Sequence, residues 1–139
     1  MSEPKTFSVT VVETSRDARG WASNLLDFLP LSPAQIANVH VVSMKHGAIR
    51  GNHRHRRQTE WIVVCGGPCR IAIDDGCQQF YQLHDGAQPL LLSLSPGTAH
   101  AVQYLGDGEA YLVCITDAPY DFERPDVERV NLLPKEDES

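Results

Sequence analysis

The feature that most constrains the fold of this chain is a series of short β-rich runs separated by residues that favour turns. The gaps between the runs contain Gly, Pro, Asp and Ser, which accept a positive φ or preset a turn. Runs punctuated in this way are typical of an all-β sandwich or barrel. The expected strands are Thr6–Glu13, Ile36–Met44, Thr59–Val64, Cys69–Ile73, Gln78–Leu83, Pro89–Leu94, Thr98–Tyr104 and Glu109–Thr116.

The strongest hairpin signal is Asp75-Gly76, which lies between two alternating runs. A type I′ turn needs two residues that tolerate a positive φ, so we expect that turn here. One segment, Ser15–Leu29, departs from the strand pattern and is the only expected helix. Its apolar residues recur at roughly helical spacing and prolines that would end a helix follow them: Trp21, Leu25, Leu26 and Leu29, then Pro30 and Pro33.

Composition limits the classes of function. The 139 residues suit one domain, which we expect over residues 1–134, with a disordered charged tail at 135–139. A net charge of −6 disfavours nucleic acid and anionic lipid as partners. No stretch approaches membrane-spanning length and the first residues lack a secretory pattern, so we expect a cytoplasmic protein without a membrane partner. The four cysteines are expected to be reduced thiols.

His53 and His55 are separated by one residue, so on a strand both imidazoles project from the same face and could grip one ion. A solvated pair would show the same spacing. Glu60 follows after a stretch that lets the chain turn and return antiparallel, with its carboxylate facing the histidines. It shares a strand face with Ile62 and Val64, where an unpaired charge is costly.

The alternative for Glu60 is a weak ion pair with Arg56 or Arg57 at the rim. His100 begins another strand, and its inward phase matches that of Val102 and Tyr104. A lone histidine in that position is more often a buried structural residue than a ligand.

Taken together, these residues resemble the cupin family. Its first motif resembles the segment Gly47-x5-His53-x-His55-x4-Glu60-x6-Gly67, and its second resembles Pro96-Gly97-x2-His100. The resemblance implies a single-domain cupin, which is a jelly-roll or double-stranded β-helix barrel and usually a dimer. The second motif departs from the family in two ways, because Pro96 abuts Gly97 and Tyr104 stands where asparagine is common. Those departures leave the pocket's shape and substrate open.

The cupin resemblance also implies a ligand set pointing into the barrel's mouth: His53, His55, Glu60 and His100. Imidazole and carboxylate ligands suit a divalent transition metal such as zinc, manganese, iron or nickel, and do not choose among them. Four ligands leave positions open for water or substrate, so such a site could act as a Lewis acid or activate a water.

A second resemblance, carried by Ile49–His55 and by the chain end Tyr120–Val130, is to cupin enzymes of deoxysugar biosynthesis. In nucleotide-sugar 3,5-epimerases and 3,4-ketoisomerases, a comparable Arg-Gly-x-His segment lines the pocket and its histidine transfers a proton. This implies a catalytic role for His53. A histidine that ligates a metal lacks the free nitrogen of a mobile base, so the two roles exclude each other. Glu60 favours the metal.

If a metal holds His53, another residue must move the proton. Tyr104 is the catalytic candidate because it shares the inward face of His100, and the alternative is a core tyrosine. Tyr111, on the next strand, is a further possibility. A basic cluster also stands near the histidines, suited to an anionic ligand such as a sugar diphosphate or else to protecting a strand edge. It comprises Arg50 and Arg54, the expected substrate-binding residues, with Arg56 and Arg57.

Three functions follow from these features. The first is an isomerase or epimerase of a nucleotide-linked keto sugar, the second a metal-dependent oxygenase on a small organic substrate, and the third a non-catalytic carbohydrate-binding or ligand-sensing cupin. The barrel fold alone does not choose among them. A homodimer is also expected, because exchange of the strand Thr6–Glu13 would cover a free sheet edge.

Overall fold

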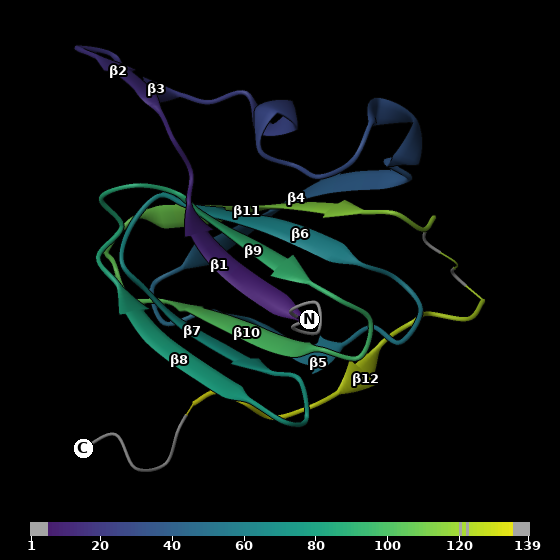
Figure 1. The fold of residues 1–139 in the computed structure, drawn as a ribbon. Helices are drawn as coiled ribbons and strands as arrows, with labels where there is room; N and C mark the ends of the chain where they lie inside the picture. The colour runs from purple at the N-terminus through teal and green to yellow at the C-terminus, as the bar shows by residue number, and fades with distance from the viewer. Residues whose placement is uncertain (1–5, 120, 122, 135–139) are drawn as a thin grey trace.

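Two five-stranded sheets face each other in the computed structural model, which describes residues 6–119, 121 and 123–134 (Figure 1). The first sheet has the order β1 (Phe7–Val11), β9 (Leu90–Leu94), β6 (Glu60–Cys65), β11 (Glu109–Thr116) and β4 (Asn38–Lys45). The second has the order β12 (Glu128–Arg129), β5 (Ile49–Arg54), β10 (Ala99–Tyr104), β7 (Cys69–Asp74) and β8 (Gln79–His84). Every paired strand is antiparallel. The predicted all-β barrel is confirmed.

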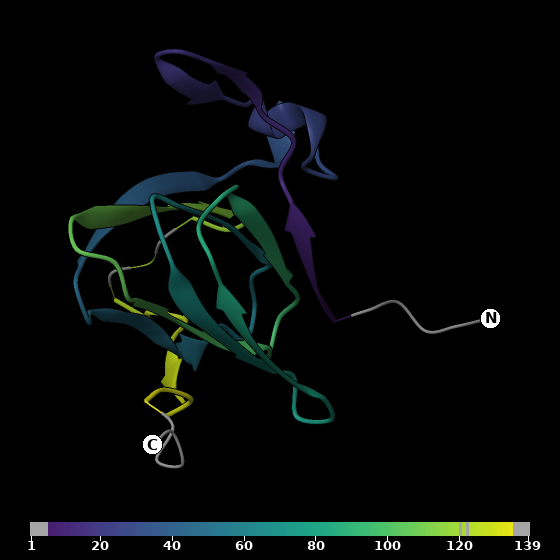
Figure 2. The same ribbon diagram turned by 90° about the vertical axis from the view of Figure 1, so that its left-hand side faces the viewer.

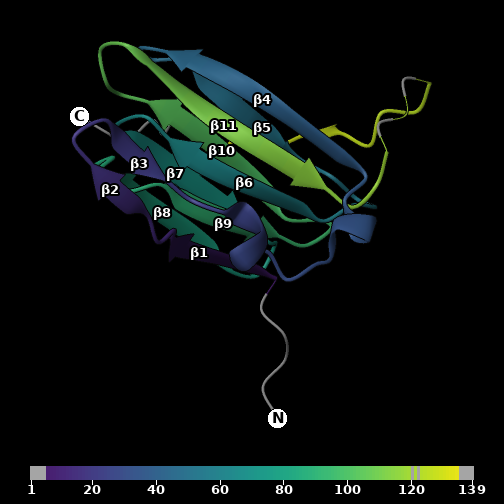
Figure 3. The same ribbon diagram turned by 90° about the horizontal axis from the view of Figure 1, so that it is seen from above.

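Viewed from above, the strands of the first sheet lie side by side from β4 at one edge to β1 at the other (Figure 3). Each predicted strand is present, with small shifts at its ends. The hairpin of β7 and β8 also forms, but its turn differs from the prediction. Gly76 has a positive φ of 95° while Asp75 does not, and the strands are joined by a longer loop, in which Asp75 Oδ1 accepts from the backbone N–H groups of Cys77 and Gln78.

The helix predicted over Ser15–Leu29 is wrong. This segment forms β2 (Ser15–Asp17), β3 (Gly20–Ala22) and a 3-10 turn, η1 (Leu25–Asp27), and a second turn, η2 (Pro33–Gln35), follows. The β2–β3 hairpin projects away from the two sheets (Figures 1 and 2). Its Trp21 is exposed, so the apolar spacing does not mark one buried helical face.

The central strands of the first sheet are covered on both faces. Ile62 and Val64 of β6 point between the two sheets, into the main core, whereas Trp61 and Val63 pack outside against Val12 and neighbouring residues of the irregular segment. This double burial explains why β6 reads as a continuous apolar run after Glu60. The end of the segment that was expected to be helical, with the residues that follow it, therefore covers part of the outer face of the first sheet.

No helix in the described part of the chain has the length and apolar character needed to cross a membrane. The strand expected to exchange between protomers, β1, pairs with β9 of its own chain in this structure. The tail predicted at 135–139 lies outside the described residues, as does Tyr120 of the resembling chain end.

Candidate active site

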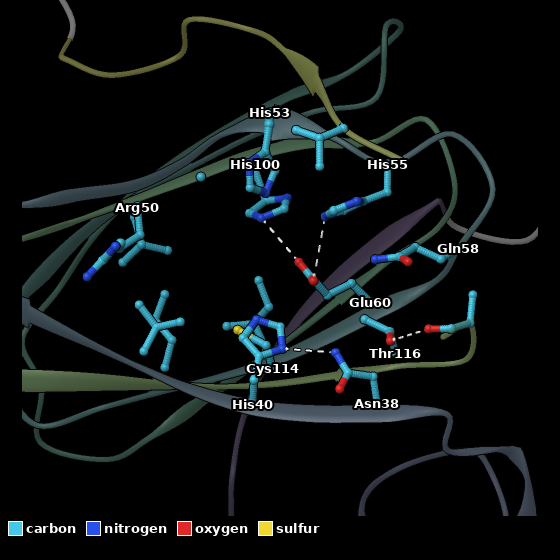
Figure 4. A pocket seen from close by; sticks show the side chains of 17 residues that line it. Asn38, His40, Arg50, His53, His55, Gln58, Glu60, His100, Cys114 and Thr116 are labelled. Atoms are coloured by element: carbon cyan, nitrogen blue, oxygen red, sulfur yellow. Dashed lines mark hydrogen bonds and ion pairs between the residues drawn. The ribbon is translucent and has the colours of Figure 1, made fainter. Parts of the chain in front are cut away.

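A cavity of about 650 Å³ opens between the two sheets at one end of the barrel (Figure 4). Apolar side chains such as Ile62, Val102 and Leu112 form its floor. The polar side chains come from both sheets. The second sheet supplies Arg50, His53 and His100, and the loop after β5 supplies His55. The first sheet supplies Glu60 and His40.

A bulge in β5 brings His53 opposite His100. The two histidines are register partners, but Ala101 pairs with Gly51, so Asn52 is an extra residue. Both bulge residues have positive φ, 90° at Gly51 and 54° at Asn52. A Cβ on Gly51 would lie 2.6 Å from the carbonyl oxygen of His100, so only glycine fits here. Residues three positions apart normally face opposite sides of a strand. The extra residue of the bulge allows both Arg50 and His53 to line the cavity.

Glu60 lies at the start of β6 and is only 5% exposed. Its carboxylate faces two imidazoles, with Oε1 3.3 Å from Nε2 of His100 and Oε2 3.6 Å from Nε2 of His55. Burial raises its pKa from 4.5 to about 7, because the low-dielectric surroundings disfavour the charged form. The alternative pairing of Glu60 with Arg56 or Arg57 at the rim is wrong.

Of the histidines in the cluster, His100 is buried and His53 and His55 are partly buried. Burial, followed by the charge of His55, lowers the pKa of His53 to about 4. Burial, followed by the charges of His53 and His55, lowers the pKa of His100 to about 3. In the absence of a metal, both rings are therefore neutral near neutral pH and offer a lone pair to the cavity.

The side chains of this cluster are arranged so that they could hold a metal ion. Ligand atoms of His53, Glu60 and His100 all lie within 4.8 Å of one another, and His55 Nε2 reaches the same carboxylate. Nδ1 of His55 donates to the backbone carbonyl of Asp126 at 2.5 Å, which leaves the lone pair on Nε2, the atom that faces Glu60. Metal-binding histidines commonly have such an outer partner. Nδ1 of His100 is buried with no hydrogen-bond partner among the described residues.

The predicted basic cluster is largely neutralised by the segment near β12. Arg54 and Arg56 pair with Glu128, and Arg57 lies 3.7 Å from Asp126. Arg54 is not among the cavity-lining residues, since it points away from the face that carries His53. Arg50 does line the cavity, where its guanidinium donates through Nε and Nη2 to the carbonyl of Ser43.

Tyr104 is not brought to this site. It is 3% exposed in the main core, at the opposite end of β10 from His100, and its ring packs against Gly67 and Gly106. Tyr111 also lies elsewhere, half-exposed, and donates to Glu109. Neither residue is among those that line the cavity.

The cavity is also lined by polar residues of the first sheet that were not predicted from the sequence: Asn38, His40, Cys114 and Thr116. Their signal was present in the strand phase. In β4, Asn38, His40 and Val42 alternate with outward residues and share the phase of the buried Met44. In β11, Cys114 and Thr116 share the phase of Leu112 in the same way.

Residues 15–128 match the model of the polysaccharide biosynthesis C-terminal domain. The chain belongs to this family. No curated protein matches this chain in sequence. Several solved structures do, each at about a fifth sequence identity or less, and these likenesses show the shared fold.

The 3'-monoepimerase ChmJ from Streptomyces bikiniensis, determined in complex with dTDP-quinovose, matches with a TM-score of 0.72 and 21% identity over 93% of this chain and 71% of its own. A 3,4-ketoisomerase from Helicobacter canadensis matches with a TM-score of 0.69 and 18% identity over 88% of this chain and 90% of its own. The capsular polysaccharide assembling protein CapF from Staphylococcus aureus matches with a TM-score of 0.63 and 20% identity over 87% of this chain and 34% of CapF. This family member thus spans about a third of CapF and has the cupin fold of the sugar isomerases.

Proposed function

We propose that this chain binds a divalent transition metal and isomerises or epimerises a nucleotide-linked keto sugar. The observation that carries the proposal is the cluster of His53, Glu60 and His100, which lies at a cavity large enough for a sugar in a fold shared with ketoisomerases and an epimerase. The family's association with polysaccharide biosynthesis supports a sugar substrate.

The proposed ligands are His53, His55, Glu60 and His100. When bound, the metal would supply Lewis-acid chemistry that polarises a carbonyl and favours an enolate. His53 and His100 already present neutral imidazoles, so the histidines need not lose protons to ligate near neutral pH. The carboxylate of Glu60 would be held ionised by the same ligation, against the effect of its burial.

Arg50 is the proposed anchor for the nucleotide diphosphate. Its guanidinium lines the cavity, and no carboxylate among the described residues forms an ion pair with it. Arginine carries a permanent charge and matches phosphate oxygens with its fork of donors. Arg54 retains a substrate-binding role only if substrate binding opens its pair with Glu128.

The test has two stages. Elemental analysis of protein purified without a histidine tag should find about one equivalent of metal, and a His53→Ala, Glu60→Ala double variant should lose it. Nucleotide-linked 4-keto sugars, including TDP-4-keto-6-deoxyglucose, should then gain deuterium from solvent in their rings, as followed by NMR. Failure of every sugar to bind or exchange would exclude the isomerase. Bound iron with oxygen consumption would favour the oxygenase instead.

The predicted homodimer also stays a proposal. Both β1 and β4 are edge strands of the first sheet, so each leaves backbone groups free for pairing. The exposed Val39 on the outer face of β4 adds apolar surface beside that edge. Sedimentation at micromolar concentration should show two copies per particle, and a monomer would refute the dimer.

A further inference from the structure

His40 lies on the wall of the cavity opposite the proposed metal ligands. It belongs to β4 of the first sheet, whereas His53 and His100 belong to β5 and β10 of the second. Figure 4 shows its ring pointing up into the cavity, toward the side chain of Glu60 and the three other histidines. The residue as a whole is exposed.

The partner of His40 differs in kind from the partner of His55. Nδ1 of His55 faces a backbone carbonyl, which only accepts, so the proton of that ring is fixed on Nδ1. Nδ1 of His40 faces the side-chain amide of Asn38, with Nδ2 at 3.4 Å. An amide donates through Nδ2 to a bare ring nitrogen and, turned over, accepts through Oδ1 from a protonated one. His40 can therefore change its protonation state without losing its partner.

The other titratable groups that line the cavity are unsuited to carrying a proton. Four of them are the proposed ligands His53, His55, Glu60 and His100. Arg50 keeps its charge permanently. Burial, followed by the charge of Glu60, raises the pKa of the Cys114 thiol to about 12, so this neighbour of His40 across the β4–β11 pair keeps its proton.

We propose that His40 is the mobile proton carrier of this pocket, the role that the sequence suggested for Tyr104. The proposal rests on the proposed sugar isomerase function. Nε2 of His40 takes a proton from the carbon beside the substrate's ketone. The electron pair of that C–H bond forms the carbon–carbon double bond of an enolate, as the carbonyl π pair moves onto oxygen. The imidazolium then returns the proton to the same carbon or exchanges it with solvent, or it protonates the former carbonyl carbon while the O–H proton of the neighbouring hydroxyl passes to the enolate oxygen, which makes that neighbouring carbon the new ketone.

The test compares His40→Gln with Val41→Gln. Val41 lies next to His40 on β4 but is 64% exposed on the outer face, so its variant controls for a polar change on the same strand. Both proteins are loaded with metal and assayed in D2O with the substrate that the parent exchanges. Loss of a general acid–base residue should lower kcat for deuterium entry by about 100-fold or more in His40→Gln, with unchanged TDP affinity and metal content. Val41→Gln should match the parent.

Added imidazole should partly restore exchange in His40→Ala, an effect that a merely structural residue would not show. Exchange in His40→Gln within about threefold of the parent, or equal loss in Val41→Gln, overturns the assignment and leaves the isomerase standing. Absence of exchange in the parent itself is a different result, visible before any variant is made. It overturns the proposed function, and the role of His40 falls with it.

Discussion

Strand β10 passes through both ends of the barrel, and the two ends contrast. At the closed end, Tyr104 pairs in register with Cys69, and both are buried among apolar side chains of the main core. At the open end, His100 and Glu60 are buried to a similar degree, 4% and 5% exposed, yet they are polar and border a cavity. A similar degree of burial therefore has different consequences at the two ends. Burial of apolar atoms stabilises the fold, whereas burial of ionisable groups shifts their pKa values.

The largest expected effect comes from the closed end. Tyr104→Ala should lower the free energy of unfolding by about 3 to 5 kcal/mol, because it leaves a cavity where the ring packs against Gly67 and Gly106. Urea unfolding measures the change. Tyr104→Phe keeps the ring and should stay within about 1 kcal/mol of the parent. Loss of sugar exchange in a folded Tyr104→Phe would break the contrast, since it would give the closed end a catalytic role.

At the open end, Glu60→Gln should leave a folded protein that has lost most of its metal affinity. Loss of an outer hydrogen-bond partner typically lowers metal affinity about 10- to 100-fold, so loss of a ligand should exceed about 100-fold. Competition against a chromogenic chelator measures the affinity. The exposed Glu109→Gln on β11 is the matched control and should bind as the parent does. Unchanged affinity in Glu60→Gln would remove Glu60 from the site.

The same carboxyl predicts a pH dependence for protein stripped of metal. Burial raises its pKa from 4.5 to about 7, so folding favours the protonated acid. This contribution is fully present below about pH 4.5 and is lost as the pH rises through about 7. The stability difference between parent and Glu60→Gln should therefore fall by about 2 kcal/mol between about pH 5 and pH 8. A stability difference that stays constant or rises with pH would contradict the raised pKa of Glu60.

The smallest expected effect concerns the support of the cluster. The side chain of Asp126 accepts hydrogen bonds from the backbone N–H groups of Arg56 and Arg57, which fixes the segment whose carbonyl binds His55. Asp126→Ala should lower metal affinity about 10-fold by loosening His55. Asp121→Ala, which removes similar bonds to Glu123 and Arg124, should have no effect on the metal. If the two variants behave alike, the outer partner of His55 is unimportant.

The contrast between the two ends also separates what the sequence could predict from what it could not. Local signals predicted the strands and the inward phase of Glu60 and His100, because strand alternation and turn residues act over a few positions. The same rule would have found His40. It could not distinguish Tyr104 from His100, since both share one face of β10 and only the packing of the other strands shows which end is closed.

Longer-range features were inaccessible for physical reasons. The helical spacing of Trp21, Leu25 and Leu29 failed because Leu25 and Leu29 are placed by the outer face of a distant sheet, whereas Trp21 is exposed on the β2–β3 hairpin. The pairs of Arg54 and Arg56 with Glu128 join residues more than 70 positions apart, so the cluster looked basic in sequence and is largely neutral in space.

The bulge residue Asn52 connects the pocket to residues made later in synthesis. Its Oδ1 accepts from the backbone N–H groups of Leu132 and Leu133, and its Nδ2 donates to the carbonyl of Leu133. As the ribosome adds residues in order, every proposed ligand emerges before this segment and before Asp126. A nascent chain halted between Thr116 and Asp126 would thus hold the whole ligand set and both sheets except β12, yet lack the bonds that set His55 and the β5 bulge. The bonds that hold His55 and Asn52 can therefore form only after every strand of the barrel except β12 has been made.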